Sequence, residues 1–219
     1  YWDQIDNTNI NGSFAFLQTP MTVDWIAFDK LYGSQGYGSF NAFNGNTIYG
    51  VGTNISSGTS EIMNNFATMI GQTAYTLVDG SGYDILNVSN YSDDQFINLA
   101  PTELNSTLPS SSSIGGLVNN LTIGVNTILE EAIGGSGNDT FLGNIANNVF
   151  KGGSGGDTFY DSLGSDTYYG GSGTFDTLYF SENYSDFSIE NLGTSLALSR
   201  DNSGSGDTDL IWNDVELVY

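Results

Sequence analysis

A nine-residue repeat between positions 134 and 178 is the feature that most constrains the fold of this 219-residue chain. Its units begin at Gly134, Gly143, Gly152, Asp161 and Gly170. The sixth position of the first four units carries a side-chain carbonyl or carboxylate oxygen, in Asp139, Asn148, Asp157 and Asp166. The eighth position carries an aromatic ring, in Phe141, Phe150, Phe159 and Tyr168. A period of about nine is too short for a helical hairpin and is typical of a parallel β-roll, in which each unit is one turn and one short strand.

The turns of this repeat have the composition of calcium sites. Glycine lets the backbone curl its carbonyl oxygens toward one point, and Asp adds charged oxygens there. The fifth unit has one extra residue, which moves its acid to Asp176 and its apolar residue to Leu178. The predicted calcium ligands of the repeats are Gly134, Ser136, Asp139, Gly143, Asn148, Gly152, Ser154, Asp157, Asp161, Asp166, Gly170, Ser172 and Asp176. A flexible linker has a similar composition, but a linker does not require a large apolar residue in phase with an acid.

Two units make one coil of a β-roll, so turns that share an ion lie eighteen residues apart. This spacing pairs the turns 134–139 with 152–157, 143–148 with 161–166, and 152–157 with 170–176. The residues at the eighth position are expected to point inward and to stack on one another as the core of the roll.

Two further stretches resemble the repeat. "DGSGYDILN" places Asp79 and Asp84 as additional calcium ligands and Leu86 as the inward residue, although an ordinary hairpin turn has a similar sequence. "SGSGDTDLI", at 203–211, matches less well and is also compatible with a turn between the last two strands.

Charge and composition exclude several functional classes. The net charge of −22 opposes binding to nucleic acid and to anionic membranes, and 18 of the 25 acidic residues are Asp, a short oxygen donor suited to hard cations. Without Cys or His, the chain has no disulfide, no ordinary zinc site and no Ser/His/Asp triad. It also has no apolar run of 18 residues and no basic-then-apolar leader, so we expect neither a membrane span nor an N-terminal signal peptide.

The predicted fold class is all-β: a parallel β-roll of calcium-binding nonapeptide repeats flanked by antiparallel strands, with one short N-terminal helix. The helix is expected at 19–33, with Thr19 as its cap, Pro20 at its first position and Gly33 at its end. Its aromatic residues share one face, which favours docking on a core: Trp25, Phe28 and Tyr32. Short runs between 49 and 133 alternate as strands do, and the strands after the repeats are expected to form an antiparallel sheet that closes the roll.

Four stretches resemble the C-terminal part of the serralysin family, secreted zinc metalloproteases of the metzincin group with a calcium-filled β-roll. They are "EEAIGGSGNDTFLGNIANNVFKGGSGGDTF", "TLVDGSGYDILNVSNYSDDQFINLA", "PMTVDWIAFDKLYG" and the opening "YW". The last pair looks like the residues after the family's Met-turn, where a tyrosine can ligate zinc. The H-E-x-x-H helix is missing, so Tyr1 has no zinc to ligate in this chain, and zinc belongs to an upstream protease domain.

The resemblance implies four segments: 1–33 as a remnant of a protease-like domain with its linking helix, 34–133 as strands leading into the roll, 134–180 as the roll, and 181–219 as closing strands with a possible secretion signal. The implied partners are calcium ions, the upstream protease domain and the type I secretion machinery, and the implied location is extracellular. "ELVY", at 216–219, is similar to a type I secretion signal, and a plain closing strand explains it equally well.

Two other functions fit the sequence. A calcium-dependent module of an adhesin, matrix or surface-layer protein would use the same roll as a rigid spacer. An independent polysaccharide-active enzyme would need paired carboxylates such as Asp93 with Asp94, or Glu130 with Glu131. Adjacent residues of a strand point to opposite faces, so neither pair is expected to converge on one bond.

Overall fold

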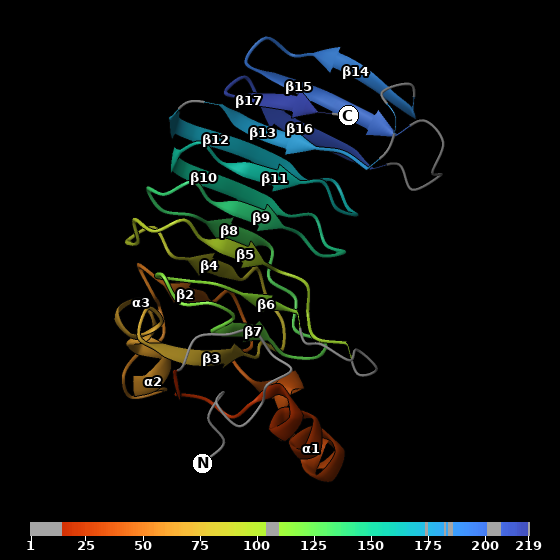
Figure 1. Ribbon diagram of the computed structural model, residues 1–219. Helices are drawn as coiled ribbons and strands as arrows, with labels where there is room; N and C mark the ends of the chain where they lie inside the picture. The colour runs from red at the N-terminus through yellow and green to blue at the C-terminus, as the bar shows by residue number, and fades with distance from the viewer. Residues whose placement is uncertain are drawn as a thin grey trace.

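The repeats fold as alternate strands of two parallel sheets that face each other, as the computed structural model in Figure 1 shows. The structure describes residues 15–103, 110–173, 175–181, 183, 186–200 and 207–218, so the expectation for Tyr1 lies outside it. The larger sheet has the order β14-β15-β16-β12-β10-β8-β4-β2 and the smaller sheet has the order β17-β13-β11-β9-β5.

The bounds of the larger sheet's strands are β2 Ile48–Gly50, β4 Ile85–Asn87, β8 Glu131–Ile133, β10 Val149–Gly155, β12 Thr167–Gly173, β14 Phe187–Asn191, β15 Ser195–Arg200 and β16 Thr208–Trp212. Those of the smaller sheet are β5 Phe96–Asn98, β9 Thr140–Leu142, β11 Thr158–Tyr160, β13 Asp176–Tyr179 and β17 Val215–Val218. Each repeat unit therefore contributes one strand, alternately to one sheet and to the other.

The pairing register confirms that one coil contains two units. Val149 of β10 lies opposite Thr167 of β12, and Thr140 of β9 lies opposite Thr158 of β11, both eighteen residues further along the chain. The same parallel pairing joins β8 to β4 and β4 to β2. The coil thus continues from the repeats into the segment before residue 134.

The aromatic residues at the eighth position form the core of the roll, as predicted. All four rings are fully buried. Phe141 stacks on Phe159 along the smaller sheet with ring centroids 5.0 Å apart, and Phe150 stacks on Tyr168 along the larger sheet at 5.5 Å. Phe141 also meets Phe150 across the two sheets at 5.7 Å. Between the repeat strands, each sheet therefore contributes one column of rings to the core.

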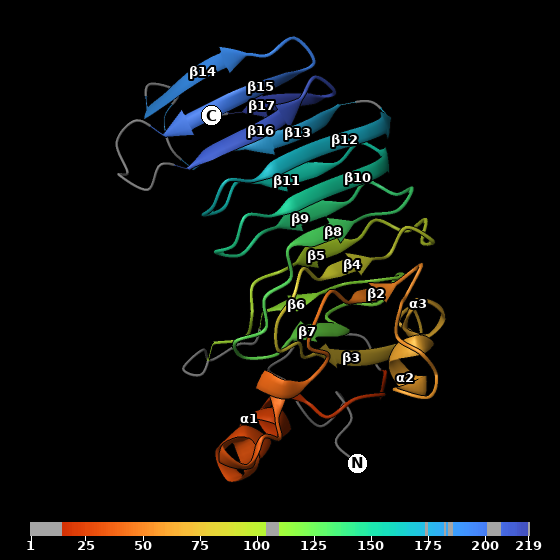
Figure 2. The same ribbon diagram turned by 180° about the vertical axis from the view of Figure 1, so that it is seen from behind.

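The N-terminal end of the roll is covered by a third sheet and by two one-turn helices that the sequence analysis did not predict (Figure 2). The sheet has the order β1-β3-β7-β6, with β1 Phe16–Leu17, β3 Thr73–Leu77, β6 Ser111–Ser112 and β7 Leu121–Ile123. The helices are α2, Glu61–Asn64, and α3, Phe66–Met69. Met63 and Phe66 are buried, so these helices shield the apolar end of the column.

The predicted N-terminal helix exists as α1, Thr22–Tyr32, but it begins later than expected. Thr19 is not its cap: the Thr19 hydroxyl accepts a hydrogen bond from the Thr76 amide at 2.6 Å and so extends the edge of β3. Met21 occupies the N-cap position, and its amide donates to the Asp24 carboxylate at 3.0 Å. Gly33 is the C-cap of α1, as predicted, and the chain continues directly into the 3-10 helix η2, Gly33–Gln35. A second 3-10 turn, η3, spans Ser39–Asn41.

The expectation that α1 docks on a core is wrong. No residue of α1 is buried, and Phe28 and Leu31 are exposed on its apolar face. The aromatic residues do lie close together, since the ring centroids of Trp25 and Phe28 are 6.0 Å apart. The helix α1 itself projects from the end of the roll (Figure 1).

The closing sheet is only partly antiparallel, which corrects the prediction for the C-terminal segment. β14 pairs antiparallel with β15, and β15 with β16, but β16 pairs in parallel with β12 and β17 in parallel with β13. The reason is that Ile211 and Leu217 extend the two inward columns, lying opposite Tyr168 and Leu178. The chain therefore adds one more coil to the roll, with the β14–β15 hairpin inserted before it. In the part of the chain that the structure describes, no helix has the length and apolar character needed to cross a membrane.

Candidate metal centre

Buried polar side chains at the sixth position of the smaller sheet form a column, which we call the Asp157 column: Gln95, followed by the carboxylates of Asp139, Asp157 and Asp176. Each of the first three residues donates its backbone amide hydrogen to the carboxylate of the residue one coil later. The Asp139 amide donates to the Asp157 carboxylate at 2.8 Å, and the Asp157 amide donates to the Asp176 carboxylate at 2.8 Å. This ladder holds the carboxylates in line along the roll and turns them inward beneath the glycine-rich turns.

The first glycine of each turn is required by a close approach. A Cβ atom on Gly152 would collide with the Asp157 carboxylate and with the carbonyl oxygen of Gly170, one coil later. Gly134 is placed in the same way against Asp139 and the Gly152 carbonyl. The turn therefore brings backbone carbonyl oxygens and a carboxylate to the same place, which is the donor set that calcium prefers.

One oxygen atom in the Asp157 column has no partner. Asp157 is fully buried, and its Oδ2 atom accepts no hydrogen bond, while Oδ1 is held by the Asp139 amide. A buried carboxylate oxygen without a donor is costly unless a cation balances it. Burial, together with the negative charges of Asp139 and Asp176, raises the pKa of Asp157 to about 7. Both the unpartnered atom and the glycine cradle fit a calcium ion.

The sixth-position residues of the larger sheet form a second column, the Asp166 column: Thr47, Asp84, Glu130, Asn148, Asp166 and Asp209. In its central part the protein satisfies its own polar groups. The side-chain Nδ2 atoms of Asn144 and Asn148 donate to the Leu129 carbonyl at 2.8 and 3.1 Å. The Asp166 Oδ2 atom accepts from the Ser162 and Tyr168 hydroxyls at 2.7 and 3.1 Å. The two columns therefore differ in what they leave for an ion.

Asp79 and Asp84 lie together in the turn before β4, as the sequence predicts. The Asp79 carboxylate accepts from the Tyr49 hydroxyl at 2.7 Å, and the Asp84 carboxylate accepts from the Thr47 amide at 2.7 Å. Both are buried, and burial raises the pKa of each. The hairpin reading of this stretch is wrong, because β4 pairs in parallel with both β2 and β8.

The remaining predicted ligands fall into three places. The serines of the third position lie near the surface, where the Ser154 and Ser172 hydroxyls bond to each other at 2.8 Å and Ser136 is exposed. Gly143 and Gly170 pack against the sixth-position side chains of their own turns. Asp161 is bound by the guanidinium of Arg200, so the structure gives it a protein cation as partner.

Two carboxylates of the Asp166 column were missed as candidate ligands by the sequence analysis. Glu130 precedes Asn148 by eighteen residues, a spacing that could have found it, and its carboxylate accepts from the Asp84 amide at 2.7 Å. Asp209 is fully buried and accepts from the Asp166 amide at 2.9 Å. Asp209 and Ile211 thus stand at the sixth and eighth positions of a repeat unit, one residue out of register with the match at 203–211, of which 203–206 lie outside the described residues. Glu131 lies on the opposite side of its strand from Glu130 and binds Lys151 and Tyr83, so this pair does not converge on one bond.

Stability in calcium-free buffer is expected to rise as the pH falls from about 8 to about 5. Burial raises the pKa of Asp139 to about 6 and that of Asp157 to about 7, so the folded chain holds protons that the unfolded chain has released. The free energy of unfolding therefore decreases as the pH rises through this window. With millimolar calcium the trend should reverse, because protons compete with the ion for the same oxygens. The β signal in circular dichroism, recorded in chelator and in calcium at both pH values, tests this, and a β signal in chelator that decreases on acidification would contradict it.

The chain matches the family described as "Peptidase M10 serralysin C terminal" over residues 39–213. It is 34% identical over 155 residues to the metallopeptidase AprA of Pseudomonas marginalis, a match that covers 69% of this chain and 29% of the relative. Serralysin B of Dickeya chrysanthemi is 34% identical over 142 residues, covering 65% of this chain and 26% of the relative. Serralysin of Proteus mirabilis is 30% identical over 148 residues, covering 68% and 27%.

The matches thus span less than a third of the length of these relatives. They cover the segment in which the structure shows the two-sheet roll and its carboxylate columns. The chain belongs to the serralysin C-terminal family of the M10 peptidases.

Proposed function

We propose that this chain is the calcium-binding β-roll of a secreted, serralysin-type metalloprotease, and that it folds on calcium after export. The observation that carries the proposal is the Asp157 column. It contains three buried Asp residues, and the Oδ2 atom of Asp157 has no hydrogen-bond partner. The turns around these carboxylates have glycine where a side chain would collide with them. Lys151 and Arg200 form ion pairs with Glu131, Asp161 and Asp209, which lie outside this column.

Asp139, Asp157 and Asp176 would hold calcium together with the backbone carbonyls of their turns. The ion supplies positive charge and oxygen coordination between coils. The chain's own residues position the donors. The amide-to-carboxylate ladder holds one oxygen of each Asp, the Gly135 amide holds the second oxygen of Asp139 at 2.6 Å, and the Oδ2 atom of Asp157 is left for the ion. Asp79 and Asp84 form a second proposed site, in which two buried carboxylates face one turn.

Folding would then depend on the compartment. The net charge of −22 opposes compaction, and extracellular oxygen-rich calcium sites bind at about 10⁻⁴ to 10⁻³ M, far above the calcium concentration of a cytosol. The chain would stay unfolded before export, in a state that a type I secretion channel can pass, and would fold outside. The strand β17 at the C-terminal end is where a secretion signal is proposed.

The protease domain is proposed as the partner of α1. The helix presents an exposed apolar face with Val23, Phe28 and Leu31, and it projects from the end of the roll nearer to the N-terminus (Figure 2). The matched relatives are more than three times as long as the segment that they share with this chain. Because the chain contains neither His nor Cys, the catalytic zinc and the peptide-cleaving activity belong to that domain.

Asp157→Ala is expected to reduce calcium affinity and the cooperativity of calcium binding more than Asp166→Ala. Asp157 lies between the carboxylates of Asp139 and Asp176 and has an oxygen free for an ion, whereas both oxygens of Asp166 are already engaged by protein donors. Fewer available carboxylate oxygens give a weaker calcium site.

Calorimetric calcium titration of the two variants decides between the columns. Equal losses, or a larger loss for Asp166→Ala, would show that the ions do not follow the Asp157 column. Calcium affinity unchanged in both variants would contradict calcium binding by the repeats.

A further inference from the structure

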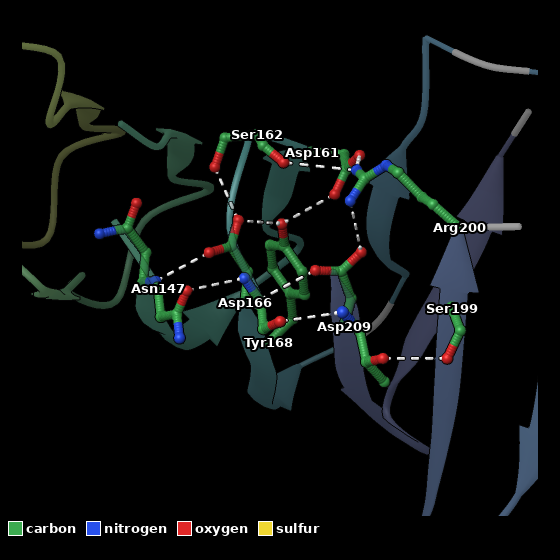
Figure 3. A network of polar contacts seen from close by, with 11 residues as sticks. Asn147, Asp161, Ser162, Asp166, Tyr168, Ser199, Arg200 and Asp209 are labelled. Carbon is green, nitrogen blue, oxygen red and sulfur yellow. Dashed lines mark hydrogen bonds and ion pairs between the residues drawn. The ribbon is translucent and has the colours of Figure 1, made fainter. Parts of the chain in front are cut away.

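Three carboxylates meet at the C-terminal coil of the Asp166 column, and we call them the Asp209 cluster: Asp161, Asp166 and Asp209 (Figure 3). One oxygen from each lies within 4.8 Å of the others. Asp166 and Asp209 are at most 1% exposed, and the side chain of Asp161 is 4% exposed. Three negative charges this close, removed from water, are strongly destabilising unless a cation or protonation neutralises them.

Arg200 brings a cation to the cluster. Its side chain is 8% exposed and reaches over from β15. The guanidinium donates to the Asp161 carboxylate, to the Asp209 carboxylate at 3.4 Å and to the Ser162 carbonyl at 3.3 Å. It also lies over the ring of Phe187, 5.6 Å from the centroid. A planar, permanently charged group with several donors is well suited to hold two carboxylates and a carbonyl at once.

We propose that the guanidinium of Arg200 is the resident cation of the Asp209 cluster and excludes calcium from the last turn of the Asp166 column. The groups that it binds are the kinds that would bind the ion: two carboxylates and a backbone carbonyl. A calcium ion and a guanidinium on the same carboxylates would repel each other strongly in this buried place. This inference rests on the proposed calcium function for the other turns. It adds that one carboxylate-rich turn is occupied by an arginine side chain of the protein in place of an ion.

The other two basic residues, unlike Arg200, lie outside the sixth-position columns. Lys30 is exposed in α1, and Lys151 is paired with Glu131 on the outer side of the larger sheet at 2.6 Å, with half of its side chain in water. Only Arg200 contacts residues of a sixth-position column among these three. Because it is carried by the β14–β15 hairpin, the contact fastens this hairpin to the last coils of the roll without an ion.

The number of bound calcium ions per chain tests the proposal. Arg200→Gln, measured by equilibrium dialysis with ⁴⁵Ca²⁺ at saturating calcium, should bind one ion more than the unaltered protein, with the added site in the range of about 10⁻⁴ to 10⁻³ M. Arg200→Lys keeps the positive charge and should bind no additional ion. Lys151→Gln is the matched control, because it removes a cation paired with a poorly exposed carboxylate outside the columns, and it should leave the number unchanged.

Asp209→Asn provides a test that keeps Arg200 in place. The proposal requires this variant to bind as many ions as the unaltered protein, and the double variant Arg200→Gln/Asp209→Asn to lose the ion gained by Arg200→Gln. Loss of one ion from Asp209→Asn alone would show that calcium, and not Arg200, occupies the cluster. Arg200→Gln with no added ion, in a protein that binds calcium elsewhere, would overturn the proposal and leave the calcium function standing; no calcium in the unaltered protein would overturn the calcium function instead.

Discussion

Excess EGTA is expected to convert the β-rich circular dichroism spectrum of this protein to that of an unfolded chain, and calcium above about 10⁻⁴ to 10⁻³ M should restore it. The buried carboxylates of Asp139, Asp157 and Asp176 lie in one line and repel one another when no cation is present. Each site held at about 100 times its dissociation constant adds roughly 2.7 kcal/mol to the free energy of unfolding. Several sites acting together are comparable with the whole stability of a domain of this size, about 5 to 15 kcal/mol.

Magnesium at the same ionic strength is the control for this experiment. Its small radius and its preference for octahedral coordination with retained water make it a poor match for a cradle of carbonyl and carboxylate oxygens, so it should restore little of the β signal. Full recovery with magnesium or with sodium chloride would indicate general screening of the −22 charge in place of specific sites. A β signal that persists in excess EGTA would contradict calcium-dependent folding.

Phe159→Ala is expected to lower the free energy of unfolding by about 3 to 5 kcal/mol in saturating calcium, with every proposed calcium ligand left in place. The ring is fully buried and touches neighbours along and across the roll: Phe141 lies 5.0 Å away and Tyr168 5.7 Å away between centroids. Because the ring is fully buried among these neighbours, its removal leaves a cavity. Denaturant unfolding followed by fluorescence measures the change.

Tyr160→Ala is the matched control for that variant. Tyr160 is the next residue of the same strand, points outward with 46% of its surface exposed, and stacks on Tyr179 at 5.5 Å. Its loss should cost less than about 1 kcal/mol, because little surface is returned to water. Equal costs at the two positions would mean that the column of rings is not the stabilising core of the roll.

The repeat in the sequence was sufficient to predict the central part of the fold. A strand residue alternates between the two faces of its sheet, and a two-unit coil places equivalent residues eighteen positions apart, so the inward placement of Phe159 and the pairing of Asp139 with Asp157 follow from spacing alone. Glu130 obeys the same spacing. These features depend on local backbone geometry, which is determined by residues close together in the sequence.

The spacing did not reveal whether the apolar face of α1 is buried or exposed. Residues three and four apart on a helix make an apolar face whether that face is buried or exposed, so the pattern of Trp25, Phe28 and Tyr32 could not distinguish the two. The direction of the closing strands was also beyond the pattern, because parallel and antiparallel partners of β16 and β17 satisfy the same alternation.

The sequence by itself determined the coil, its register and the column of rings, because each depends on residues at a constant separation. Only the tertiary structure decided the partners of the charges at the C-terminal coil. Asp209 joins Asp166 across 43 positions and Arg200 reaches Asp161 across 39, separations that follow no period. They arise because the β14–β15 hairpin is inserted between two coils and returns the chain to the roll, and electrostatic partners are set by which distant segments dock together.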